Sequence, residues 1–177
     1  MMLALLQNTA LLLGMALVYE QLARRHPADT LSGGVLAGLL MGLVGIAIIL
    51  TALPFKDGIV FDSRSVLMTV CGLFLGWLPT LLAAAITIIF RVTEGGAVLT
   101  GVLSIISSAA VGLAWRHWRK GRLADIRFPE LYTCGLLVHA VLVLVFLTLP
   151  RESRWDVLAT IVLPVMLIFP LATAVLG

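Results

Sequence analysis

The sequence predicts an all-α integral membrane protein of about seven helices. Of its 177 residues, 61% are hydrophobic and only 12% are charged, and the mean hydropathy is +1.13. A globular domain is typically about 45–50% apolar and about 25% charged, so this chain has too few charges to cover a water-soluble fold. The composition excludes a soluble enzyme, a nucleic-acid-binding domain and a disordered tail.

Charged residues divide the chain into long uncharged runs, which are the second observation behind this fold class. The runs are rich in Leu and Ala and lack the alternation of a membrane β-strand, and about 20 apolar residues suffice for a helix to cross a bilayer. The runs without Asp, Glu, Lys or Arg are 1–19, 30–55, 65–90, 95–115, 131–150 and 157–177.

The first run predicts a retained membrane helix over about residues 2–22 rather than a cleaved signal peptide. No basic residue precedes its apolar stretch, whereas Arg24 and Arg25 follow it. A signal peptide has the reverse order. The second run predicts a helix over residues 33–53.

The run 65–90 is long for one span and contains Gly76-Trp77-Leu78-Pro79 near its centre. It is compatible with one long kinked helix, or with two short helices over about 65–77 and 80–91, because proline removes a helical hydrogen bond and glycine weakens its neighbourhood. Each short helix would measure about 18–20 Å, so the hairpin would need shelter from other helices. The later runs predict helices over 97–115, 131–149 and 156–175.

The distribution of basic residues favours two helices joined at Gly76–Pro79. With this split, the loop after the first helix, the turn at 77–79, the loop from Arg116 to Arg127 and the C-terminus share one face, which carries seven basic residues. On the other face acidic and basic residues balance. Cytoplasmic loops carry an excess of Lys and Arg, so we expect a bacterial inner-membrane protein with its N-terminus outside and its C-terminus in the cytoplasm.

Small residues recur at helical spacing in three predicted helices. Such stripes let helix backbones approach closely in lipid, and both packing within one chain and homodimerisation are compatible with them. Cys71 and Cys134 lie in apolar runs without a CxxC spacing, which predicts free thiols. The stripes are Gly34, Gly38 and Gly42; Gly72 and Gly76; and Gly101, Ser104, Ser108 and Gly112.

Polar residues at the two ends of the short hairpin are the candidate binding residues. Hairpin ends lie close together, so the segments 54–64 and 91–96 should converge on one outward-opening cavity. Arginine binds a carboxylate or phosphate through a planar fork, and the helix N-terminus after the glycine pair adds backbone donors. The candidates are Asp62, Arg64, Arg91, Glu94, Gly95, Gly96 and Ser104, with Lys56, Asp57 and His139 as a second tier.

A purely structural interpretation competes with this one. Arg64 would pair with Asp62 and Arg91 with Glu94, closing the bundle, and His139 would be a neutral, hydrogen-bonded core residue. The sequence contains no nucleophile–base pair, metal-ligand cluster or nucleotide-binding loop. We therefore expect no catalysis in this segment and no metal or cofactor.

The same segments resemble the five-transmembrane receptor module of the LytS-YhcK type, found at the N-terminus of bacterial sensor histidine kinases and diguanylate cyclases. The resemblance covers most of residues 1–115. The chain departs from the family pattern in two ways. Val98 stands where a third glycine is often found, and seven helices are expected here whereas the family name implies five membrane spans. The matching residues are Gln7-Asn8, Pro54-Phe55, Asp62-Ser63-Arg64, Gly72-Leu73-Phe74-Leu75-Gly76-Trp77-Leu78-Pro79, Arg91, Gly95-Gly96, Gly101 and Gly112-Leu113-Ala114-Trp115.

A more distant resemblance links residues 33–177 to the six-helix substrate-binding subunits of energy-coupling-factor vitamin transporters. It implies a six-helix core over 33–177, with residues 2–22 as an added N-terminal helix. Those subunits bind a small molecule near the extracellular side. A substrate-binding transporter subunit is therefore the alternative function, and a membrane scaffold without a pocket is a third.

The first resemblance implies a single transmembrane sensor domain over residues 1–177. Such a domain would bind a small anionic solute, a carboxylate, at its outer face and signal to a cytoplasmic kinase or cyclase domain expected after residue 177. The expected partners are membrane lipid, the small-molecule ligand and a second copy in a homodimer of the full-length receptor. Nucleic acid is not an expected partner.

Overall fold

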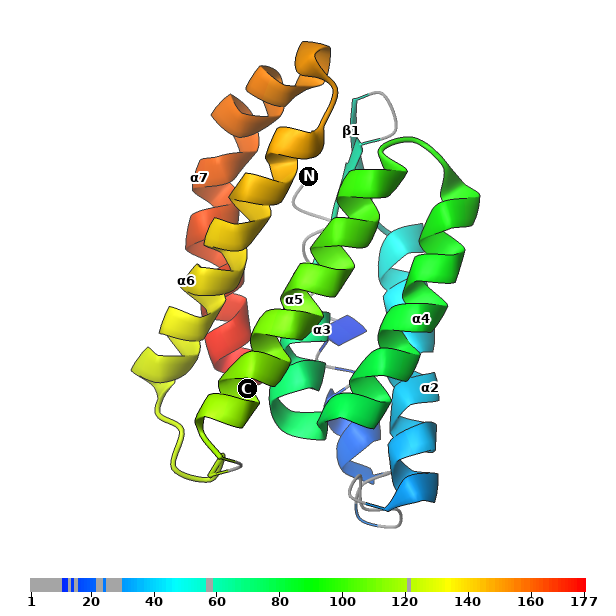
Figure 1. Cartoon of the computed structure of the whole chain (residues 1–177), viewed down its shortest axis with the longest axis vertical. Helices are drawn as coiled ribbons and strands as arrows, with labels where there is room; N and C mark the ends of the chain where they lie inside the picture. The colour runs from blue at the N-terminus through cyan, green and yellow to red at the C-terminus, as the bar shows by residue number, and fades with distance from the viewer. Residues whose placement is uncertain are drawn as a thin grey trace.

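The protein is a bundle of membrane-length helices, as predicted (Figure 1). The computed structural model describes residues 11–12, 14, 16–21, 24, 30–56, 59–120 and 122–177. Five of the described helices are long and apolar enough to cross a bilayer. The elements are α2 (Leu31–Leu50), β1 (Leu53–Lys56), β2 (Ile59–Phe61), α3 (Arg64–Val70), the π-helical turn η1 (Cys71–Leu75), α4 (Trp77–Glu94), α5 (Val98–Trp118), α6 (Phe128–Val145), the 3-10 turn η2 (Phe146–Thr148) and α7 (Arg151–Leu176).

The helix predicted over residues 2–22 lies largely outside the described residues. Those of its residues that are described, together with Arg24, are helical. Leu12 is 2% exposed and belongs to the main apolar cluster, with Met41 of α2 and Leu67 of α3. This part of the chain therefore packs against the bundle.

The predicted helix break is present, and Gly76 alone makes it. Gly76 has φ +89°, a conformation that glycine adopts without strain. Trp77, Leu78 and Pro79 already form the first turn of α4, where proline loses no hydrogen bond because the first N–H groups of a helix have no partner within it. The turn is therefore tighter than the predicted Gly76–Pro79 segment, and α4 then runs back beside α2.

A small antiparallel β-hairpin between α2 and α3 was not predicted. Leu53 of β1 lies opposite Phe61 of β2. The sequence carried a signal for it, because Asp57-Gly58 stands between the strands and Asp-Gly is a preferred hairpin-turn pair. The hairpin lies at the end of the bundle that is uppermost in Figure 1.

The small residues bring helices of this one chain into close contact. A Cβ atom at Gly38 would lie 2.7 Å from Leu82 Cβ, and one at Gly42 would lie 2.7 Å from Ile86 Cδ1, so these glycines of α2 face α4. A Cβ atom at Gly72 would lie 2.8 Å from the Ala109 carbonyl oxygen, so η1 touches the backbone of α5. The stripes thus serve packing within the chain, and homodimerisation stays a prediction.

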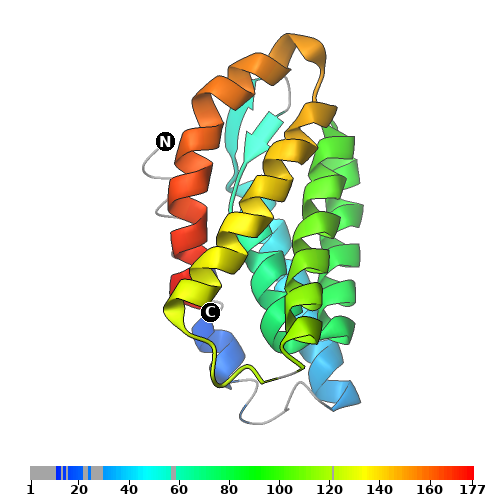
Figure 2. The same cartoon turned by 60° about the vertical axis from the view of Figure 1, so that its left-hand side comes forward.

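The connections collect at two ends, as the charge distribution predicted. Figures 1 and 2 show the start of α2, the turn at Gly76 and the loop between α5 and α6 at one end, called here the basic end. The β-hairpin, the turn between α4 and α5 and the turn between α6 and α7 lie at the other end, called here the hairpin end. Which end faces the cytoplasm stays a prediction.

Cysteine labelling would test the expected orientation. Glu152 at the hairpin end and Ala124 at the basic end are both exposed, whereas the native Cys71 and Cys134 are buried and should give little background. In intact cells we expect a membrane-impermeant maleimide to modify Glu152→Cys and to spare Ala124→Cys. Both should react after permeabilisation. If only Ala124→Cys were labelled in intact cells, the basic end would face outside and the expected orientation would be wrong.

Candidate functional site

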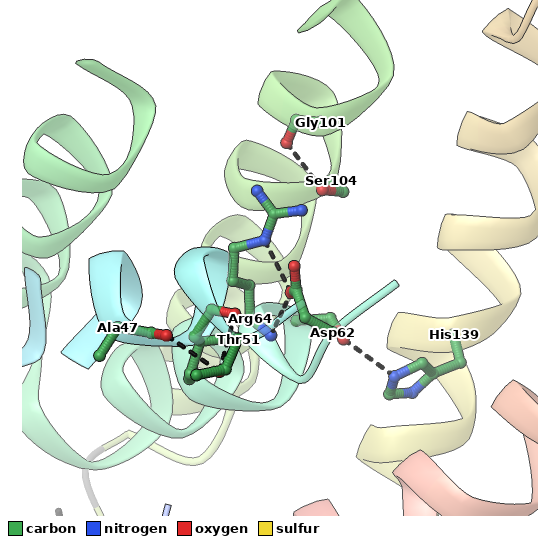
Figure 3. A network of polar contacts seen from close by, with 9 residues as sticks. Ala47, Thr51, Asp62, Arg64, Gly101, Ser104 and His139 are labelled. Atoms are coloured by element: carbon green, nitrogen blue, oxygen red, sulfur yellow. Dashed lines mark hydrogen bonds and ion pairs between the residues drawn. The ribbon is translucent and has the colours of Figure 1, made fainter. Parts of the chain in front are cut away.

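Asp62 and Arg64 form a buried ion pair at the start of α3 (Figure 3). The Asp62 Oδ1 atom accepts a hydrogen bond from Arg64 Nε at 2.7 Å and another from the Arg64 backbone N–H at 3.0 Å. The side chains of Arg64 and Asp62 are only 6% and 2% exposed. Of the two ion pairs in the structural interpretation, this one is present.

Arg91 is also buried, in the last turn of α4, but it has no carboxylate partner in the described structure. Its Nη1 donates to the Gly95 carbonyl oxygen, whereas Glu94 is exposed and makes no ion pair with it. Gly101 of α5 provides the space for Arg91, since a Cβ atom there would lie 2.5 Å from Arg91 Nε. The predicted pairing of Arg91 with Glu94 is therefore wrong for the described residues.

The turn between α4 and α5 has the tight form that its glycines predicted. Gly95 has φ +76° and Gly96 has φ +69°, values that side chains other than glycine rarely tolerate. The turn delivers the chain to Val98, where α5 begins. Its geometry fixes the position of the Gly95 carbonyl group that holds Arg91.

Positive charge exceeds negative charge in this buried region. The charge of Arg64 repels that of Arg91, whereas Asp62 and the exposed Glu94 attract Arg91, and Asp62 pairs with Arg64. Among the described residues, Arg64 Nη1 and Arg91 Nε donate to no acceptor although they are shielded from solvent, and Asp62 Oδ2 likewise has no donor. A buried charge without a full set of partners costs several kcal/mol, so the region is electrostatically incomplete as it stands.

A small cavity adjoins the ion pair. Its volume is about 40 Å³, far below the about 300–1,000 Å³ of pockets that hold drug-sized ligands. Figure 3 shows the Arg64 guanidinium pointing toward Gly101 and Ser104 of α5. The lining residues are Asp62, Arg64, Ser65, Ser104, Leu142, Phe146, Val165 and Phe169.

The structure thus brings Asp62, Arg64 and Ser104 together in the lining of one cavity. Ser104 Oγ donates to the Gly101 carbonyl oxygen at 2.7 Å, which links the cavity to the Arg91 side of α5. Arg91 itself does not line the cavity. Of the second-tier candidates, Lys56 ends β1, and Asp57 lies outside the described residues.

His139 connects the cavity wall to the helix pair formed by α6 and α7. Its ring is fully buried, and Nδ1 lies 2.7 Å from the Gly135 carbonyl oxygen. A carbonyl can only accept, so Nδ1 carries the proton and Nε2 accepts from the Ser65 hydroxyl at 3.1 Å. Phe169 of α7 packs against the ring with centroids 5.4 Å apart. His139 is therefore a hydrogen-bonded core residue that also positions a cavity residue.

Five cavity residues were missed by the sequence-based reasoning. Ser65 directly follows a candidate and could have been included on that ground. The other four are apolar pairs spaced four residues apart on the α6–η2 segment and on α7, a spacing that places each pair on one helix face. Many other apolar pairs share this spacing, so the sequence alone does not select them. The four are Leu142, Phe146, Val165 and Phe169.

The fold and site together define a multi-pass helical membrane protein with a small, polar-walled internal cavity. A family model described as the 5TMR of 5TMR-LYT matches residues 16–177. The chain therefore belongs to this family of five-transmembrane receptor modules, which are sensor domains of LytS-like histidine kinases. The match extends well beyond the resemblance over residues 1–115.

Two further observations follow from the family match. The five named spans agree with the five described helices of membrane-spanning length, because the segment Arg64–Leu75 is too short to count as one. No curated protein and no solved structure matches the chain. The resemblance to transporter substrate-binding subunits therefore stays a prediction.

Proposed function

We propose that this sensor module binds a small carboxylate in the cavity beside Arg64 and signals its occupancy to a C-terminal cytoplasmic kinase or cyclase. The observation that carries the proposal is the excess of buried positive charge around this cavity. Asp62 is the only carboxylate paired with Arg64 or Arg91 among the described residues, and there each arginine keeps a buried N–H group without an acceptor. An anion in the cavity would supply negative charge beside both arginines and an acceptor for Arg64.

The lining of the cavity supports a ligand of mixed character, and the volume of about 40 Å³ limits that ligand to a few atoms. The polar groups of the lining are the guanidinium of Arg64, the carboxylate of Asp62 and the hydroxyls of Ser65 and Ser104, and the lining residues from α6, η2 and α7 are apolar. A short monocarboxylate fits this division, because its charged end would meet Arg64 while its carbon chain meets the side chains of α6, η2 and α7. In the expected orientation, the ligand arrives from outside at the hairpin end.

Occupancy would reach the C-terminal helix through the cavity walls. The cavity lies between α3, α5, η2, α6 and α7, so a ligand contacts α3 on one side and α7, which carries the C-terminus, on the other. The contact from Ser65 to His139 to Phe169 provides a second connection between the same helices. A ligand that binds one packing of these helices more tightly than another would shift their populations.

Calorimetric titration of the purified protein with a panel of small carboxylates would test the proposal. Arg64→Lys keeps the charge next to Asp62 but loses the planar fork and its free Nη1 donor. Loss of a charge-assisted hydrogen bond of about 1.5–3 kcal/mol should weaken binding roughly 10- to 150-fold. Arg91→Lys should have a smaller effect, because its charge is kept and Arg91 does not line the cavity.

Arg122→Lys is the matched control, since Arg122 is exposed in the loop at the basic end. The affinity of Arg122→Lys for a carboxylate should equal that of the wild type. Equal affinities of the wild type and Arg64→Lys for a carboxylate that does bind would make the ion pair purely structural. The proposal would then fail.

A further inference from the structure

A second hollow lies at the basic end, away from the Arg64 cavity. Its volume is about 580 Å³, and it is formed where α4 begins and α5 ends, beside the turn at Gly76. Three of its residues are basic, one is a tryptophan and none is a carboxylate. The lining residues are Trp77, Leu113, Arg116, His117 and Lys120. We propose that this hollow binds the headgroup phosphate of an anionic phospholipid.

The basic side chains of the hollow have donors to spare. Arg116 Nη1 donates to the carbonyl oxygens of Leu73 and Phe74, both at 2.9 Å, which fixes the guanidinium beside the Gly76 turn. Its Nε and Nη2 atoms donate to no protein acceptor in the described structure, and neither do the side chains of His117 and Lys120. An anchored arginine with free N–H groups beside a second cation is well suited to a phosphate.

No ion pair among the described residues cancels the charge of Arg116 or Lys120. Glu130, at the start of α6, accepts hydrogen bonds from Trp115 Nε1 at 3.1 Å and pairs with Arg119 at 3.0 Å. Its carboxylate is therefore committed to residues outside the hollow. The positive potential at Arg116 and Lys120 is left for an external anion.

The position of the hollow favours a lipid over a soluble anion. The membrane-length helix α4 starts at Trp77, and α5 ends at Trp118, so the hollow lies at the depth where spans end and headgroups lie. Trp77 and Trp118 are 67% and 68% exposed, and tryptophans are typically found at this interface. Trp77 and Leu113 give the hollow an apolar side for an acyl chain, and basic pockets between membrane helices are known to hold acidic headgroups.

Lipid binding to the full chain in a neutral detergent would test the assignment. Native mass spectrometry would compare phosphatidylglycerol with phosphatidylcholine of identical acyl chains. We expect the protein to prefer phosphatidylglycerol and Lys120→Gln to lower that affinity about fivefold, the effect of one basic residue near an anionic lipid surface. Arg122→Gln removes the same charge from the same loop but outside the hollow, and should change nothing.

Each remaining outcome overturns the assignment. Equal affinity for the two lipids would exclude a headgroup site. Equal losses in Lys120→Gln and Arg122→Gln would indicate diffuse attraction to the whole loop. Displacement of phosphatidylglycerol by millimolar inorganic phosphate would show that a soluble anion is the ligand. Should Lys120→Gln unfold at a lower temperature, His117→Gln provides a second variant, and the lipid preference of the wild type decides independently of both.

Discussion

Arg64→Met is expected to lower the free energy of unfolding by about 3–5 kcal/mol, the usual effect of removing one partner of a buried ion pair. The methionine would fill much of the same space, so the loss comes from electrostatics rather than from a void. Asp62 would be left in the protein interior without its ion-pair partner, and its Oδ2 already lacks a donor among the described residues. Denaturant unfolding of the purified protein in detergent, followed by circular dichroism, would measure the change.

A second substitution separates the charge effect from a packing defect. In the double variant Asp62→Asn, Arg64→Met the carboxylate is gone, so most of the lost stability should return. Arg91→Met offers the opposite contrast, because Arg91 has no carboxylate partner in the described structure. Its removal should cost no more than about 1.5–3 kcal/mol, the range for a hydrogen bond made by a charged group, and therefore less than Arg64→Met. A loss in the double variant as large as that in Arg64→Met would refute the electrostatic explanation.

Gly112→Val is expected to destabilise the bundle by about 3 kcal/mol or more, at or above the upper end of the usual overpacking range. A Cβ atom at Gly112 would overlap the Thr69 carbonyl oxygen and lie 3.2 Å from Gly72 Cα. These neighbours are backbone atoms, which do not move aside as a flexible side chain can. The valine would therefore push α5 away from α3 and η1.

Gly14→Val is the matched control for this substitution. Gly14 is helical and exposed, and no atom of the described residues lies within 4 Å of a Cβ atom built there. Valine is no worse than glycine in a helix interior, so the melting temperature should stay within experimental error of the wild type. Melting of Gly112→Val at the wild-type temperature would show that the contact between α5 and η1 is looser than described.

Local chemistry explains why much of the fold could be predicted from the sequence. The helix break at Gly76 depends on a single residue with positive φ, and the ion pair of Asp62 with Arg64 joins residues two positions apart. Both features depend only on residues that are close together in the sequence. Which loops lie at the same end of the bundle could be predicted by counting charges, because the positive-inside rule depends on composition rather than on packing.

Long-range packing explains what could not be predicted. Glu94 follows Arg91 closely in sequence, yet the arginine turns toward the Gly95 carbonyl group because Gly101 of α5 leaves space for it. The apolar wall of the cavity depends on which faces of α6 and α7 meet α3. The short β-hairpin was missed for a different reason, since its Asp57-Gly58 signal is brief and stands among residues that also suit an irregular loop.

The shortness of α3 and η1 has an electrical consequence. Together they span Arg64 to Leu75, which at 1.5 Å per residue is about 18 Å, against about 30 Å of bilayer hydrocarbon. Arg64 therefore lies inside the voltage drop, and in the expected orientation an anion entering from outside crosses roughly two fifths of it. One charge moved across the full potential is worth about 2.3 kcal/mol per 100 mV. An inside-negative potential of 100 mV would thus weaken anion binding roughly fourfold to fivefold, and an energised cell would need more solute to fill the site than a depolarised one.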